Sequence, residues 1–190
     1  MSIDLTSDLI NGKHVAVVGN SKNISQRKDG IRIDAHDVVI RFNFAFPEPE
    51  LSESLGNRTD IMICARGILQ RVHRKESQWN MLSRRHPNTH LIGRHPTGFL
   101  EYHLPKKALN ECKELISKEP TTGAITVHSL MTIFNPAWVT VFGFDGLKSG
   151  VWYSNYREFP PEKNSHYHSP EREQAWLESV KDKLAVIEYD

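Results

Sequence analysis

Uninterrupted apolar runs alternate with short polar turns along this chain. The most continuous run covers residues 14–18, where Val15, Ala16, Val17 and Val18 follow one another. Apolar runs of this length without polar alternation are typical of strands that are buried on both faces, as in parallel sheets. Further strands are expected at residues 38–42, 60–65, 91–93, 138–142 and 185–189.

Helical periodicity fills the intervals between these strands. The expected helices cover residues 68–85, 106–117, 124–134 and 170–184. Alternating strands and helices predict an α/β fold, a single Rossmann-like domain over residues 1–190 with a mainly parallel central sheet flanked by helices. In such sheets ligands bind beyond the carboxyl ends of the strands. The turns at Asn20, Asn43 and Gly143-Phe144 follow three strands and are expected to meet there.

One long segment interrupts this pattern. Residues 148–169 contain Pro160-Pro161, several aromatic side chains and little periodicity. Loops of this length inside a domain are usually functional or disordered. The aromatic residues and His168 favour a function, so we expect an active-site loop or lid.

The turn Gly19-Asn20-Ser21 lies where a dinucleotide-binding fold would carry its glycine fingerprint. The second and third glycines of that fingerprint are missing, and the second strand ends in Asn43 rather than in an acidic residue that would hold a ribose. Binding of NAD is therefore disfavoured. Asparagine both donates and accepts hydrogen bonds, which suits a base or ribose edge, but Asn20 and Asn43 are equally typical of residues that close turns.

Two expected helix starts carry polar groups. Thr121-Thr122-Gly123 precedes the third helix, where exposed backbone N–H groups can hold a phosphate or a sugar carboxylate; a simple threonine cap is the alternative. Ser169-Pro170 opens the last helix and places His168 just before it. The positive end of the helix dipole disfavours the imidazolium form, which suits a general base; a surface histidine is the alternative.

Composition narrows the remaining choices. The 190 residues are 38% hydrophobic and 25% charged with a formal net charge of +1, which gives no general reason to expect a nucleic-acid partner. Cys64 and Cys112 are the two cysteines, with no disulfide framework or zinc spacing. The sequence has no apolar run of membrane-spanning length and no Asp-x-Asp metal motif. We expect a cytoplasmic protein without metal or cofactor.

Taken in order, these segments resemble the sialylmotifs of glycosyltransferase family 29, the sialyltransferases. His168 and Glu173 resemble the very small motif, and Tyr153 lies where the short third motif is expected. The large motif is matched by residues 15–21 and 33–43, the segment after it by residues 56–60, and the small motif by residues 120–144.

The resemblance implies a modified GT-A-like fold and inverting, metal-independent transfer of sialic acid from its CMP donor to a glycan hydroxyl. It implies that His168 is the general base and that Tyr153 or His166 contacts the donor phosphate. The residues implied at the CMP-sugar site are Asn20, Ser21, Asn43, Thr121, Thr122, Gly123, Gly143 and Phe144.

This chain departs from animal members of the family at two features. The disulfide that joins their large and small motifs has no cysteine here at Val15 or near residues 134–136, and their membrane anchor is not found. We expect a minimal enzyme that associates peripherally with a membrane where glycans are built. A CMP-Kdo transferase, a CMP-sugar hydrolase and a non-catalytic nucleotide-binding module remain alternatives.

Overall fold

The core of the protein is one parallel β-sheet. The computed structural model describes residues 7–73, 84, 86–96, 100, 102–146, 148–152 and 168–187. Six strands follow the order β4-β3-β2-β1-β5-β6, and each neighbouring pair is parallel, which confirms the predicted α/β fold class. The strands are β1 (His14–Val18), β2 (Val38–Phe42), β3 (Ile61–Cys64), β4 (His90–Gly93), β5 (Trp138–Phe142) and β6 (Ala185–Ile187).

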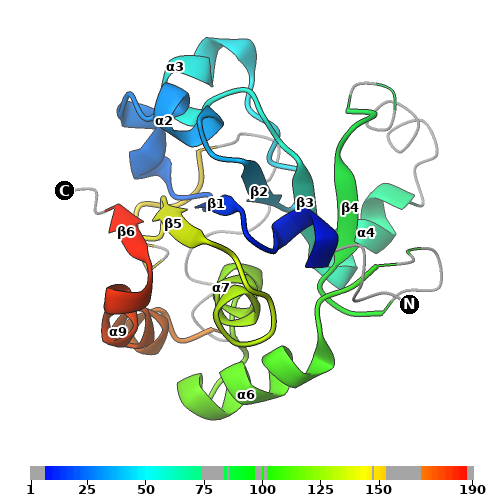
Figure 1. The fold of residues 1–190 in the computed structure, drawn as a ribbon, viewed down its shortest axis with the longest axis vertical. Coiled ribbons are helices and arrows are strands. Elements are labelled where there is room, and N and C mark those ends of the chain that lie inside the picture. The colour runs from blue at the N-terminus through cyan, green and yellow to red at the C-terminus, as the bar shows by residue number, and fades with distance from the viewer. Residues whose placement is uncertain are drawn as a thin grey trace.

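The order of the strands fixes where a ligand is expected. The chain builds outward from β1 to β4 and then returns to the other side of β1 to form β5 (Figure 1). The direction of building therefore reverses between β1 and β5. Parallel sheets bind ligands at such a reversal, because the loops that leave the two strands diverge to opposite faces and leave a crevice between them.

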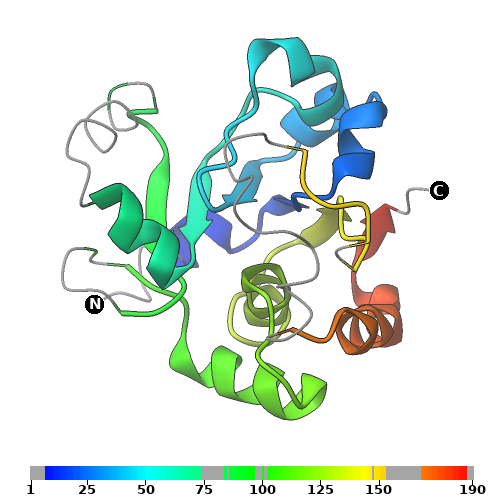
Figure 2. The same cartoon turned by 180° about the vertical axis from the view of Figure 1, so that it is seen from behind.

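Helices cover both faces of the sheet. Figure 1 shows α7 (Thr122–Thr132) and α9 (Pro170–Ser179) below the sheet, with α6 (Lys106–Ile116) packed against α7. Figure 2, from behind, shows the same arrangement, with α2 (Gly30–Asp34) and α3 (Ser52–Leu55) on the opposite face. The remaining elements are α4 (Arg66–His73) and the 3₁₀ turns η1 (Lys22–Gln26), η2 (Pro49–Leu51) and η4 (Lys181–Lys183).

The sequence of β1 explains the two layers. Val15 and Val17 pack into the cluster formed with α6, α7 and α9, whereas Ala16 and Val18 pack with Ile24 on the other face. Successive side chains of a strand point to opposite faces, so an unbroken apolar strand buries surface on both. This burial is the reason that an apolar run without alternation marks a central strand here.

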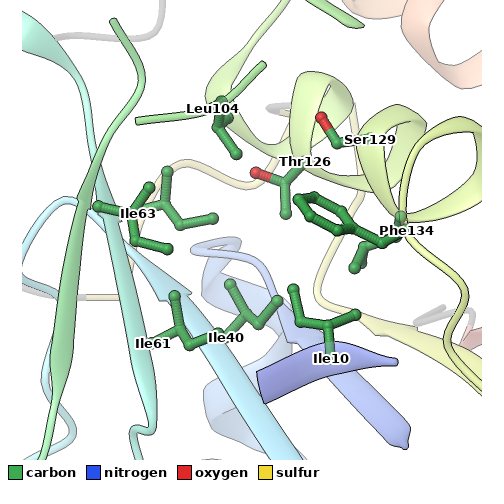
Figure 3. Close-up of a pocket in the computed structure, with 10 residues that line it drawn as sticks. Ile10, Ile40, Ile61, Ile63, Leu104, Thr126, Ser129 and Phe134 are labelled. Carbon is green, nitrogen blue, oxygen red and sulfur yellow. The ribbon is translucent and has the colours of Figure 1, made fainter. Parts of the chain in front are cut away.

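The contact between α7 and the sheet leaves a small void. Figure 3 shows Ile40, Ile61 and Ile63 of the sheet pointing toward Thr126 and Phe134 of the facing layer. The cavity between them is about 10 Å³, which is water-sized at most. The Thr126 hydroxyl donates to the Thr122 carbonyl oxygen at 2.8 Å, so it is already paired within α7. We regard the void as a packing feature of the core, not as a binding site.

Several predicted boundaries shift in the structure. The helix expected from Ala124 begins two residues earlier, at Thr122, because Thr121 caps it. The helix expected over residues 170–184 ends at Ser179 and is followed by the turn η4. The helix expected over residues 68–85 is described as α4, and residues 74–83 lie outside the described part. No helix among the described residues is long and apolar enough to cross a membrane.

Candidate active site

A cleft opens at the carboxyl edge of the sheet, with a volume of about 380 Å³. This size is within the usual range for ligand sites. Its walls come from the turns after β1 to β5 and from the starts of α7 and α9. Residues proposed from the sequence that line it are Asn20, Ser21, Asn43, Thr121, Thr122, Gly123, Gly143, Phe144 and His168.

The first wall is the junction of β1 and β5, where two backbones nearly touch. The Gly19 N–H donates to the Phe142 carbonyl oxygen at 2.7 Å. A Cβ atom at Gly19 would lie 2.3 Å from the Gly143 carbonyl oxygen, so only glycine fits there. Gly143 has a φ of +66°, which turns the chain back over this junction. Both glycines serve the close approach of the strands.

The segment after Gly143 then folds over the turn that carries Asn20. The Trp152 N–H donates to the Asn20 carbonyl oxygen at 3.2 Å, and the Lys22 N–H donates to the Gly150 carbonyl oxygen at 3.0 Å. The Ser149 N–H is in turn held by Asp145 Oδ2 at 2.9 Å. These contacts fix the backbone of Asn20 and leave its side chain at the cleft wall.

Asn43 has a structural role that the sequence left open. Its φ is 58°, a left-handed conformation that asparagine tolerates better than most residues. Its Oδ1 accepts from the Ala65 N–H at 2.9 Å and so joins the ends of β2 and β3. The side-chain oxygen is thereby engaged, and the amide N–H₂ group is the part left for a ligand.

Glu173 holds the start of α7 from a distance of 52 residues in the chain. Its Oε1 accepts from the Thr121 N–H at 2.6 Å, and its Oε2 accepts from the Thr121 hydroxyl at 2.7 Å. The same Thr121 oxygen accepts from the Ala124 N–H at 3.1 Å. Thr121 has therefore no donor left for a ligand. The Glu173 carboxylate thus fixes the start of α7 and not the start of its own helix, α9.

The next two residues of α7 are better placed to bind an anion. The N–H groups of Thr122 and Gly123 find no hydrogen-bond acceptor within the described part of the chain. Free N–H groups at a helix start attract phosphate or carboxylate oxygens. A Cβ atom at Gly123 would lie 2.8 Å from the Phe144 ring, so the glycine lets that ring close over the helix start.

His168 is oriented by a backbone carbonyl. Its Nδ1 lies 2.7 Å from the carbonyl oxygen of Glu119. A carbonyl oxygen only accepts, so Nδ1 must carry the proton, and in the neutral ring the lone pair is on Nε2. The ring therefore presents a proton acceptor at the cleft, just before Ser169 and Pro170 open α9, as predicted.

Arg94, directly after β4, is a cleft residue that the sequence did not reveal. The residue is 8% exposed, and its Nη2 donates to Glu119 Oε1. Lys113 binds the other oxygen of the same carboxylate at 2.7 Å. Burial lowers the pKa of Arg94 from its ordinary value, with Glu119 opposing that shift. An arginine after a weak strand, outside any matched motif, carries no signal of burial.

Two buried polar atoms in the cleft wall stand without a partner. Neither Ser21 Oγ nor Arg94 Nε has a hydrogen-bond partner among the described residues. Buried donors and acceptors are nearly always satisfied in folded proteins, and exceptions call for an explanation. Both atoms belong to residues that line this cleft.

Two predicted residues are not placed by the structure. Tyr153 and His166 lie outside the described residues, as does most of the expected lid at residues 148–169, of which residues 148–152 and 168–169 are described. Their roles remain predictions. Across the described ranges, no group of three or more His, Cys, Asp or Glu side chains is arranged to hold a metal ion.

Solved structures of other proteins share the fold of this chain. A mammalian sialyltransferase in complex with Gal-β-1-3GalNAc-ortho-nitrophenol is 15% identical, with a TM-score of 0.63 over 98% of this chain and 73% of that one. The sialyltransferase CstII from Campylobacter jejuni, in complex with cytidine-5'-monophosphate, is 13% identical, with a TM-score of 0.62 over 93% and 79%. At these identities the likeness shows a common fold.

A family model matches part of the sequence. The family model for glycosyltransferase family 29 (sialyltransferase) matches residues 9–98, which contain β1 to β4 and the large-motif residues Asn20 and Asn43. No curated protein sequence matches the chain. The match agrees with the resemblance drawn from the motifs and covers somewhat less than half of the chain.

Proposed function

We propose that this enzyme transfers sialic acid from a CMP donor to a glycan hydroxyl, with inversion at the anomeric carbon and with His168 as general base. The observation that carries the proposal is the 2.7 Å contact between His168 Nδ1 and the Glu119 carbonyl oxygen. The Glu119 carbonyl oxygen accepts from Nδ1 and leaves Nε2 as a proton acceptor at the cleft. A positioned base of this kind contributes about 10²–10⁴-fold to transfer reactions.

The donor is expected to lie across the reversal point of the sheet. Asn20, Ser21 and the free amide N–H₂ of Asn43 offer groups that suit a nucleotide on one side. The free N–H groups of Thr122 and Gly123 offer donors to an anion on the other. CMP is the ligand named for solved proteins of this fold, which supports the same donor here.

The chemistry needs stabilisation of charge as CMP leaves. Transferases with a metal ion use it for this purpose, and we propose that protein donors serve instead in this enzyme. Tyr153, His166 and the start of α7 are the proposed donors, and no cofactor takes part.

We further propose that the enzyme acts in the cytoplasm, peripherally at membranes that carry its acceptors. The free thiols of Cys64 and Cys112 suit that reducing compartment.

A transfer assay tests this function. CMP-Neu5Ac and CMP-Kdo are each incubated with mixed galactosides and lipopolysaccharide fragments, and products are detected by mass spectrometry. We expect a sialylated product whose anomeric configuration, read by NMR, is opposite to that of the donor. CMP release that is independent of acceptor would identify a hydrolase, and transfer from CMP-Kdo alone would replace sialic acid as the donor sugar.

Two substitutions test the base. His168→Asn keeps a side-chain N–H for the Glu119 carbonyl but removes the acceptor nitrogen, whereas His168→Ala removes both. We expect each to lower kcat by about 10²-fold or more, with CMP affinity nearly unchanged, because a base acts in the transition state. His166→Ala is the internal control. A larger loss in His166→Ala than in His168→Ala would reverse the assignment.

A further inference from the structure

Arg94 is a buried cation that the mechanism above does not use. The guanidinium has five N–H donors, yet within the described residues hydrogen-bond acceptors reach it only at Nη2. Its Nε is buried and unpaired. Leaving a charged donor buried without a partner is costly. A cation held in this way at a cleft wall is therefore prepared for a negatively charged ligand group.

The ion pair with Glu119 does not use up the charge of Arg94. The Glu119 carboxylate is shared, because Lys113 Nζ binds its second oxygen at 2.7 Å. The other carboxylate near Arg94 belongs to Glu173, and both of its oxygens are taken by Thr121. Arg94 therefore shares the charge of Glu119 with Lys113, and both oxygens of Glu173 already accept hydrogen bonds from Thr121.

The position of Arg94 relative to His168 indicates which part of a donor it meets. Glu119 joins the two residues, since its carboxylate binds Arg94 and its backbone carbonyl oxygen binds His168. A base at His168 must lie beside the acceptor hydroxyl that attacks the anomeric carbon. In a 2-keto acid sugar that carbon carries the carboxylate, so a cation next to the base is close to the carboxylate rather than to the nucleobase.

We propose that Arg94 recognises the carboxylate of the donor sugar and thereby selects acidic sugars. This inference rests on the proposed function, because it assumes that a CMP-sugar occupies the cleft. It holds for sialic acid and Kdo alike, since both carry the carboxylate on the anomeric carbon. Arg94 is then a specificity-determining residue, supplied by β4 from outside the motifs that mark the site in the sequence.

The test compares three ligands by calorimetry: CMP, the non-transferable 3-fluoro analogue of CMP-sialic acid, and the C1 carboxamide of that analogue. Wild-type protein is expected to bind the acid about 10- to 100-fold more tightly than the amide, as for a hydrogen bond to a charged group. Arg94→Met is expected to bring that ratio close to one, and Arg94→Lys, which keeps the charge but loses the fork of donors, to lower it, while CMP affinity changes little. Arg66→Met, an exposed arginine beside the cleft, is the matched control and should keep the wild-type ratio.

The outcomes separate this inference from the function on which it rests. An unchanged ratio of acid to amide in folded Arg94 variants overturns the inference, as does an equal loss of affinity for CMP, acid and amide. The second result would place Arg94 at the phosphate or in a purely structural role. Absence of any CMP or CMP-sugar binding by wild-type protein would instead overturn the proposed function. Arg94→Lys keeps the charge and serves if Arg94→Met does not fold.

Discussion

The contact between Glu173 and Thr121 gives the sharpest stability prediction, because it joins α9 to the start of α7 at the cleft. The glutamate accepts two hydrogen bonds from Thr121, at 2.6 and 2.7 Å. A hydrogen bond to a charged group contributes about 1.5–3 kcal/mol. In Glu173→Gln one acceptor oxygen remains for the Thr121 N–H, and the hydroxyl loses its acceptor.

The expected cost of Glu173→Gln is near the lower limit of that range, about 1.5 kcal/mol. Burial opposes the ionised carboxylate and raises the pKa of Glu173 above its ordinary value of 4.5, and an uncharged glutamine escapes this penalty. Glu171→Gln is the matched control, since Glu171 is an exposed acidic residue in the same first turn. Both variants lose a favourable interaction with the helix dipole, about 0.3–1 kcal/mol.

The assay is urea unfolding of the two variants and the wild type, followed by circular dichroism. The raised pKa means that the folded state binds this proton more tightly than the unfolded state does. Stability from Glu173 is then fully present below the ordinary glutamate pKa and falls as pH rises through the raised value. Glu173→Gln should therefore cost more at about pH 4 than at about pH 8. Equal free energies of unfolding for both variants at every pH would refute this reasoning.

Three further predictions concern the ligand. CMP should raise the melting temperature more than UMP or GMP, and equal shifts for the three nucleotides would argue against a site that reads cytosine. Transfer activity should survive EDTA, whereas loss with EDTA and recovery with Mg²⁺ or Mn²⁺ would require a metal ion in the mechanism. Asn20→Ala should weaken CMP binding by about 1–3 kcal/mol at unchanged stability. Asn43→Ala should lower both affinity and stability, because Asn43 Oδ1 also holds the Ala65 N–H; unaltered CMP affinity in both variants would reduce the two asparagines to turn residues.

Much of the fold followed from the sequence because it depends on local patterns. The unbroken apolar run at residues 15–18 can be buried only in the middle of a two-sided layer, and that is where β1 lies. Turns after parallel strands meet at one edge of a sheet, so Asn20, Asn43 and Gly143 were expected together and all line the cleft. The order of strands and turns along the sequence was enough to predict where these walls lie.

Tertiary structure alone decided the roles of Arg94, Glu119 and Glu173. Arg94 is buried because β4 pairs with β3 and brings it to the cleft wall, where Glu119, from a segment 25 residues away, binds it. Glu173 meets Thr121 across 52 residues. Local patterns determine which segments become strands and helices, but the partner of a charged side chain depends on which segments the fold brings together. The sequence by itself therefore determined the layers of this protein and the location of its cleft, whereas only the packed structure decided which charges line it.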